Sequence, residues 1–145
     1  LMSQFLSLDY GLKRVGVAYC EAPLNIAYAL TTVNTKDLFN FLETYIKKNK
    51  VSKIIVGNPK SLRGEPTHST EFTHTFFNKI SIMYQEIDFE LYDERFTSKI
   101  AKQTVLSSGV KKMKRRNKEN IDKISAVIIL QDYLQSVEFY KPSKT

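Results

Sequence analysis

Cysteine, histidine and long apolar runs are scarce in this chain, and each scarcity excludes a class of protein. The single cysteine, Cys20, excludes an intramolecular disulfide and a zinc site made of several cysteines. The two histidines, His68 and His74, are too far apart to share a helical face, so we expect both on the surface and find no Ser–His–Asp set. No apolar run approaches the roughly 20 residues that span a bilayer, and the N-terminus lacks a secretory pattern. We therefore expect a cytoplasmic protein with no membrane partner.

Acidic residues are outnumbered, and the excess of positive charge indicates a polyanionic partner. The chain has 22 lysines and arginines against 15 aspartates and glutamates, for a net charge of +7. Nucleic acid is favoured over a membrane because no strongly apolar amphipathic face accompanies this charge. With 145 residues, of which 42% are hydrophobic, the chain fits one domain with a real core. We predict a single domain over residues 1–145, with flexible ends at 1–3 and 137–145.

The apolar pattern predicts a mixed α/β fold. Short segments rich in apolar and β-branched residues predict strands at 4–9, 15–20, 26–32, 53–57 and 89–92. Helical spacing predicts helices at 38–46, 72–84, 97–106 and 121–136, with Thr35 as N-cap of the first. Three strands that can form a meander, followed by alternating helices and strands, imply a mixed five-stranded sheet flanked by helices.

Acidic residues stand at the ends of these predicted elements, each beside cations. Asp9 ends the first strand in a tight hairpin, and the Asp93–Glu94 pair ends the last strand. Asp122 falls in the first turn of the final helix. Each acid alone has an ordinary explanation: a turn cap, a solvated loop, or a favourable interaction with the helix macrodipole. Their joint arrangement predicts one site, because loops at strand ends converge in α/β sheets.

Carboxylates brought this close repel one another unless cations intervene. Oxygen ligands suit Mg²⁺ or Mn²⁺ rather than zinc. Two such ions about 3.5–4 Å apart can activate water and stabilise the leaving oxygen when a phosphodiester is hydrolysed. The acids therefore indicate a two-metal nuclease that needs no covalent nucleophile.

Cations in the neighbouring loops suit a phosphate backbone, although each alone is more often a solvated surface charge. The loops nearest the acids carry Lys13, Arg14, Lys60, Arg63 and Arg95. A dense basic run directly precedes the final helix and consists of Lys111, Lys112, Lys114, Arg115, Arg116 and Lys118. This run predicts an electrostatic clamp on nucleic acid, with a solubilising loop as the alternative.

Four motifs in this order resemble the YqgF family, also called RuvX, described as pre-16S rRNA nucleases. They are DYGLKRVGVA at 9–18, VGNP at 56–59 with Gly64, DERFTS at 93–98 and IDKISAVIILQDYL at 121–134. The resemblance implies an RNase H-like fold and a metal-dependent nuclease, related to Holliday junction resolvases and linked to maturation of the 16S rRNA 5′ end. It also implies that Asp9, Glu94 and Asp122 are the catalytic, metal-binding acids. Alternation along a strand points Asp93 away from the face of Glu94, so Glu94 is preferred.

The sequence departs modestly from the family pattern and leaves other functions open. Asn58 replaces an apolar residue of the VGxP loop, and Ser125 replaces an alanine of the last helix; neither change removes an acid. A resolvase of branched DNA would keep the same chemistry but act as a symmetric dimer, whereas the sequence allows a monomer or a homodimer. An actin-like ATPase needs two such lobes, and a non-catalytic binding module leaves the acids without a role.

Overall fold

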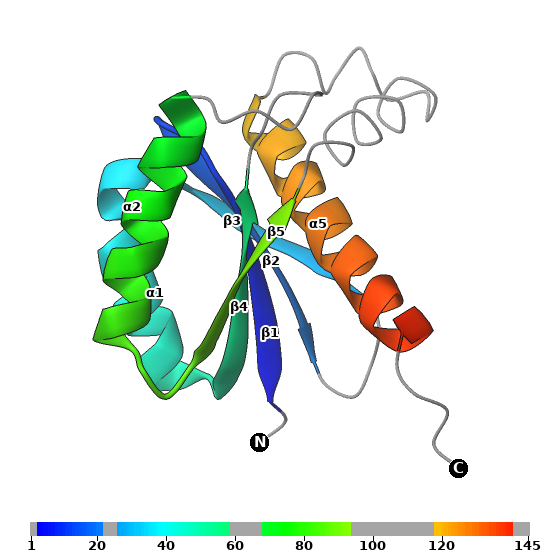
Figure 1. The fold of residues 1–145 in the computed structure, drawn as a ribbon. Helices are drawn as coiled ribbons and strands as arrows, with labels where there is room; N and C mark the ends of the chain where they lie inside the picture. The colour runs from blue at the N-terminus through cyan, green and yellow to red at the C-terminus, as the bar shows by residue number, and fades with distance from the viewer. Residues whose placement is uncertain (1–2, 22–25, 59–67, 94–117, 141–145) are drawn as a thin grey trace.

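The computed structural model describes residues 3–21, 26–58, 68–93 and 118–140 (Figure 1). The strands are β1 (Gln4–Tyr10), β2 (Arg14–Glu21), β3 (Tyr28–Asn34), β4 (Val51–Asn58) and β5 (Asp88–Asp93). The helices are η1 (Thr35–Asp37), α1 (Leu38–Lys48), α2 (His68–Met83) and α5 (Lys118–Tyr140). The predicted helix at 97–106 lies outside the described residues.

The five strands form one mixed sheet, as the sequence predicts. Their order is β3-β2-β1-β4-β5. The first three strands form an antiparallel meander, while β4 and β5 run parallel to β1. Because β1, β4 and β5 share a direction, all three end at the same edge of the sheet. That edge is where the sequence predicts the acidic site.

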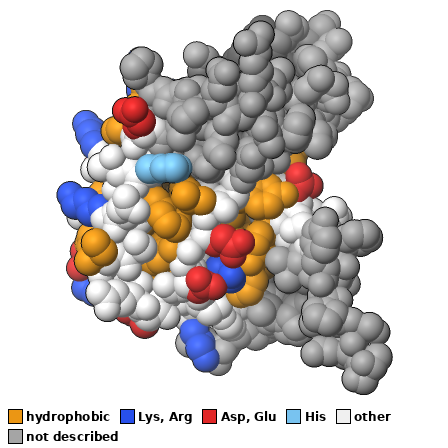
Figure 2. Space-filling view, viewed as in Figure 1, with side chains coloured by type: hydrophobic (Ala, Val, Ile, Leu, Met, Phe, Trp, Pro, Cys, Tyr) orange, Lys and Arg blue, Asp and Glu red, His pale blue; other side chains and the backbone are white. Residues whose placement is uncertain are grey.

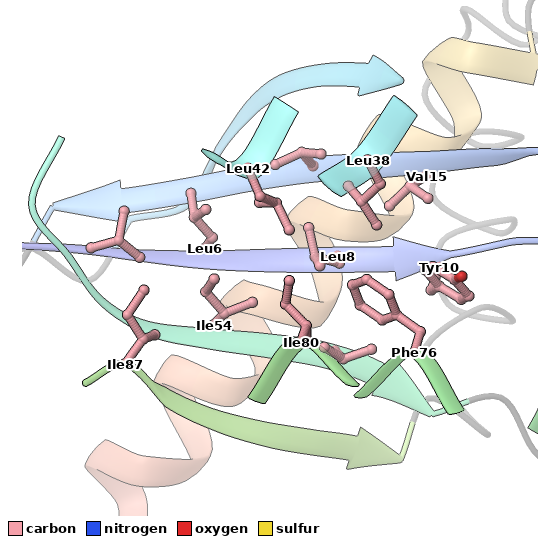
Figure 3. Close-up of a cluster of buried hydrophobic side chains, with 13 residues drawn as sticks. Leu6, Leu8, Tyr10, Val15, Leu38, Leu42, Ile54, Phe76, Ile80 and Ile87 are labelled. Atoms are coloured by element: carbon pink, nitrogen blue, oxygen red, sulfur yellow. The ribbon is translucent and has the colours of Figure 1, made fainter. Parts of the chain in front are cut away.

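Helices cover both faces of the sheet, with α1 and α2 on one face and α5 on the other (Figure 1). On the first face, Leu6 and Leu8 of β1 meet Leu42 of α1 and both Phe76 and Ile80 of α2 (Figure 3). All five side chains are buried, and they close the larger of the two cores. This packing fixes the even-numbered side chains of β1 on the α1/α2 face.

The second core lies beneath α5. Ala18, Cys20 and Ile55 from the sheet pack against Ala126 and Leu130 of the helix. Cys20 is buried as predicted, and burial raises the pKa of its thiol. No helix in the described part of the chain has the length and apolar character needed to cross a membrane.

The structure corrects several local predictions. Helix α2 begins four residues before the predicted start at residue 72, and β3 lies two residues later than the predicted strand at 26–32. Helix α5 is longer than predicted, extending from Lys118 to Tyr140, because no proline or glycine interrupts residues 118–140. Thr35 does not cap α1, which has Asp37 at its N-cap position and no side-chain cap bond. The Thr35 hydroxyl instead donates a hydrogen bond to the carbonyl oxygen of Gly11, at 2.7 Å. This contact belongs to the hairpin that follows Asp9.

Candidate active site

Asp9 stands near the end of β1 on the face covered by α5. Side chains alternate along a strand, and Leu8 and Tyr10 belong to the core on the α1/α2 face. Ser7, two residues before Asp9, bonds to α5 and so marks the opposite face. The half-buried Asp9 carboxylate therefore projects on the α5 side, at the edge where the parallel strands end.

The hairpin that follows Asp9 is held in one shape by backbone contacts. The Gly11 N–H donates to the carbonyl oxygen of Arg14 at 3.0 Å. A Cβ atom at Gly11 would lie 2.7 Å from that oxygen, so the turn admits no larger residue there. Thr35, the first residue of η1, makes two hydrogen bonds to the turn. Its hydroxyl donates to the carbonyl oxygen of Gly11, and its N–H donates to the carbonyl oxygen of Lys13 at 2.9 Å.

These hydrogen bonds bring the backbone of a third cationic residue next to the two cations of the hairpin. Lys13 is exposed and Arg14 is half-buried at the start of β2. Lys36, which is exposed and follows Thr35 directly, is brought beside the same turn. Sequence reasoning missed Lys36, because only the pairing of Arg14 with Asn34 reveals that residues so distant in sequence are neighbours.

A hydrogen bond joins helix α5 to β1. The Ser7 hydroxyl donates to the Ala126 carbonyl oxygen at 2.6 Å. The helix runs opposite to β1, so that its beginning lies at the edge where β1 ends (Figure 1). The backbone of Asp122 precedes Ala126 by about one helical turn. The backbones of Asp9 and Asp122 therefore lie toward the same edge of the sheet.

The other predicted site residues are described only in part or not at all. The backbone of Asp93 ends β5 opposite Asn58 of β4, and the backbone of Lys118 begins α5. The remaining residues lie outside the described part of the chain: Glu94, Lys60, Arg63, Arg95, Lys111, Lys112, Lys114, Arg115 and Arg116. Among the side chains that are described, no three His, Cys, Asp or Glu form a metal-binding group. Of the predicted acids, Asp9 has a described side chain, so the metal site stays a prediction.

A second charged cluster lies at the start of β4 and β5. The Lys53 ammonium contacts Asp88 at 2.8 Å and Glu90 at 3.1 Å, and lies over the ring of Tyr133 of α5. The Tyr133 hydroxyl donates to Glu90 at 3.0 Å. Burial acts to lower the pKa of Lys53, but its hydrogen bonds to Asp88, Tyr133 and Glu90 outweigh it and raise the pKa above the usual range. Figure 2 shows acidic side chains beside a basic one on the face in view. The hydrogen bond between Tyr133 and Glu90 joins α5 to β5.

Comparison with solved structures supports the fold. The chain resembles a Fowlpox virus resolvase, solved with its substrate Holliday junction DNA, with a TM-score of 0.57. The match covers 92% of this chain and 98% of the viral chain at 11% sequence identity, so it bears on the fold alone. The mixed five-stranded sheet with flanking helices is thus the RNase H-like α/β fold that the sequence predicts.

Comparison of sequences gives the family. A protein of Flavobacterium psychrophilum is 44% identical over 92% of this chain and 97% of its own length. A protein of Flavobacterium johnsoniae is 44% identical over 95% of this chain and 100% of its own length. Both carry the name "Putative pre-16S rRNA nuclease". The model of the RuvX family, described as Holliday junction resolvase, matches residues 3–136. The chain belongs to the RuvX family.

Proposed function

We propose that this RuvX-family chain is a metal-dependent nuclease that processes the 5′ end of pre-16S rRNA during ribosome biogenesis. The observation that carries the proposal is the Ser7–Ala126 contact, which brings the β1 strand of Asp9 against the helix of Asp122. The substrate is taken from the names of the Flavobacterium relatives, which match nearly the whole chain. A protein with this role acts where ribosomes are assembled, so we expect it in the bacterial cytoplasm.

The donor set fits a hard divalent cation. Asp9, Glu94 and Asp122 supply carboxylate oxygens alone, which suit Mg²⁺ or Mn²⁺. Two such ions, when bound, would activate water and neutralise charge on the leaving oxygen. In β5, Glu90 contacts Tyr133 of α5, and Tyr92 packs against the core beneath that helix. The same alternation predicts Glu94, rather than Asp93, for the face of Asp9.

Cations around this edge would hold the phosphate backbone. Lys13 and Arg14 belong to the hairpin that follows Asp9, and Lys36 follows Thr35, which is hydrogen-bonded to that hairpin. Positive charge offsets the repulsion between a polyanion and the acids, and it makes the affinity fall as salt rises. Lys60, Arg63, Arg95 and the basic run of Lys111, Lys112, Lys114, Arg115, Arg116 and Lys118 would extend this contact along the nucleic acid.

Branched DNA is the second candidate substrate, because the matching family model is described as Holliday junction resolvase. A resolvase cuts two strands symmetrically and so acts as a dimer. The proposed rRNA reaction has no such requirement, and either a monomer or a homodimer would serve.

The experiment is parallel cleavage of a pre-16S 5′ leader and a four-way DNA junction, each with Mg²⁺, with Mn²⁺ and with excess EDTA. We expect metal-dependent cleavage of the leader at a defined position, and Asp9→Asn serves as the inactive control. Cleavage of the junction alone, in symmetric pairs, would favour the resolvase. Undiminished cleavage in EDTA would contradict the metal-dependent mechanism.

A further inference from the structure

We propose that Ser7 is a positioning residue that sets the spacing between Asp9 and Asp122. This inference rests on the proposed function, because it concerns two of the acids expected to bind metal. It assigns a role to a buried polar side chain that the proposed chemistry does not use.

The Ser7 contact is a specific tie between a strand and a helix. Ser7 and Ala126 are both 0% exposed, and the Ser7 hydroxyl donates to the Ala126 carbonyl oxygen at 2.6 Å. A buried hydroxyl without a partner would be costly, so this bond is needed once Ser7 is placed there. The carbonyl lies within α5 and can also accept the ordinary helical bond, since it has two lone pairs. The helix therefore does not need Ser7 for its own hydrogen bonding, and the bond serves to join the two elements.

The tie stands at nearly the same distance from both acids. Asp9 is two residues beyond Ser7, which is about 6.8 Å along a strand. Asp122 is four residues before Ala126, which is about 6 Å along a helix. Because α5 runs opposite to β1, both steps lead to the same edge of the sheet (Figure 1). A slide of the helix along the strand would therefore change the separation of the two acids directly.

Apolar packing by itself does not fix the axial position of the helix. Ser7 is flanked in the sheet by Ala18 of β2 and Ile55 of β4, and both belong to the apolar cluster beneath α5 that includes Ala126. Apolar contact is non-directional, whereas a hydrogen bond fixes an axial position. Two other hydrogen bonds described for α5 are farther along the helix: the Ala27 N–H donates to Gln131 at 3.0 Å, and Tyr133 donates to Glu90. Among the bonds described for α5, the Ser7 bond is the one nearest to Asp122.

The test compares Ser7→Ala with Tyr133→Phe, a control that removes a hydrogen-bonded hydroxyl from the same helix farther from Asp122. Loss of a residue that orients metal ligands commonly costs about 10- to 100-fold in metal affinity or activity. We expect Ser7→Ala to raise the Mn²⁺ concentration for half-maximal cleavage by about tenfold and to lower kcat, with KM for the nucleic acid nearly unchanged. Tyr133→Phe should leave both metal activation and kcat close to wild type.

Amide hydrogen exchange, measured without metal, separates this inference from the proposed function. We expect faster exchange around residues 122–130 in Ser7→Ala than in Tyr133→Phe. If the wild-type protein needs no metal but this difference appears, the metal mechanism fails and the tie stands. Equal exchange in the two variants, or equal effects on metal activation, would overturn the role assigned to Ser7.

Discussion

Asp9 lies directly opposite Gly16 in the antiparallel ladder of β1 and β2. Directly opposed side chains of such a ladder project on the same face, with Cβ atoms about 4.5–5.5 Å apart. Since Gly16 has no side chain, the β2 position directly opposite Asp9 carries no Cβ atom on the α5 side. A glycine inside a strand often marks a place where a ligand approaches closely. Gly16 is itself buried, so a side chain added there would crowd the surroundings of Asp9.

A side chain at Gly16 should impair cleavage. Gly16→Val adds a β-branched side chain that suits a strand but crowds Asp9, and a small misplacement of a catalytic group can cost about 100-fold in rate. We expect at least a tenfold loss of kcat for Gly16→Val, on the same principle, and a smaller loss for Gly16→Ala. Cleavage rates and thermal melting are measured together. Wild-type rates for the valine variant would show that the site tolerates a side chain opposite Asp9.

The fold was largely predictable because its pattern is local. Continuous apolar runs predict β4 and the strands of the meander, and helical spacing predicts α1, α2 and α5. The position of Asp9 at the end of β1 follows from the same pattern. The long-range contacts of the site could not be predicted this way. The Thr35–Gly11 bond, the nearness of Lys36 to the hairpin and the Ser7–Ala126 tie each join residues that lie far apart in the sequence.

Removing the charge of Asp9 should abolish most of the activity without unfolding the protein. Asp9→Asn keeps the shape of the side chain but removes a charged oxygen ligand, and a bound cation contributes several kcal/mol to catalysis, so we expect a loss of about 100-fold or more. The matched control is Glu43→Gln, which breaks an exposed ion pair with Lys47 of 3.3 Å on α1. Circular dichroism should show both variants folded. Comparable losses of activity in the two would mean that general charge, and not this site, is responsible.

Lys13 and Lys36 should contribute to binding rather than to the chemical step. Each neutralised phosphate contributes about 0.7 to 0.9 to the slope of log affinity against log salt. Lys13→Gln and Lys36→Gln should each weaken binding and reduce that slope by about this amount, with little change in kcat. Lys47→Gln removes the same charge from an exposed position on α1 and serves as control. A slope reduced equally by all three would indicate diffuse attraction and no contact at the hairpin.

The cluster of Lys53, Glu90 and Tyr133 should make the protein lose stability at alkaline pH. Burial raises the pKa of the Tyr133 phenol, against the opposing effect of its hydrogen bond with Lys53. An unfolded tyrosine loses its proton near pH 10, while the folded protein still holds it. The contribution is therefore complete below about pH 10 and declines as pH rises toward the folded-state pKa. The raised pKa of Lys53 acts in the same direction, since its contribution also declines as pH rises.

We therefore expect the free energy of unfolding, measured by urea denaturation from pH 7 to 11, to fall less steeply in Tyr133→Phe than in the wild type. Lys53→Met should also flatten the alkaline limb, because it removes the other group of the cluster whose pKa is raised. At pH 7 the tyrosine variant should lose about 1.5–3 kcal/mol, the usual value of a hydrogen bond to a charged group. Parallel curves for the wild type and both variants would show that the cluster does not couple proton binding to folding.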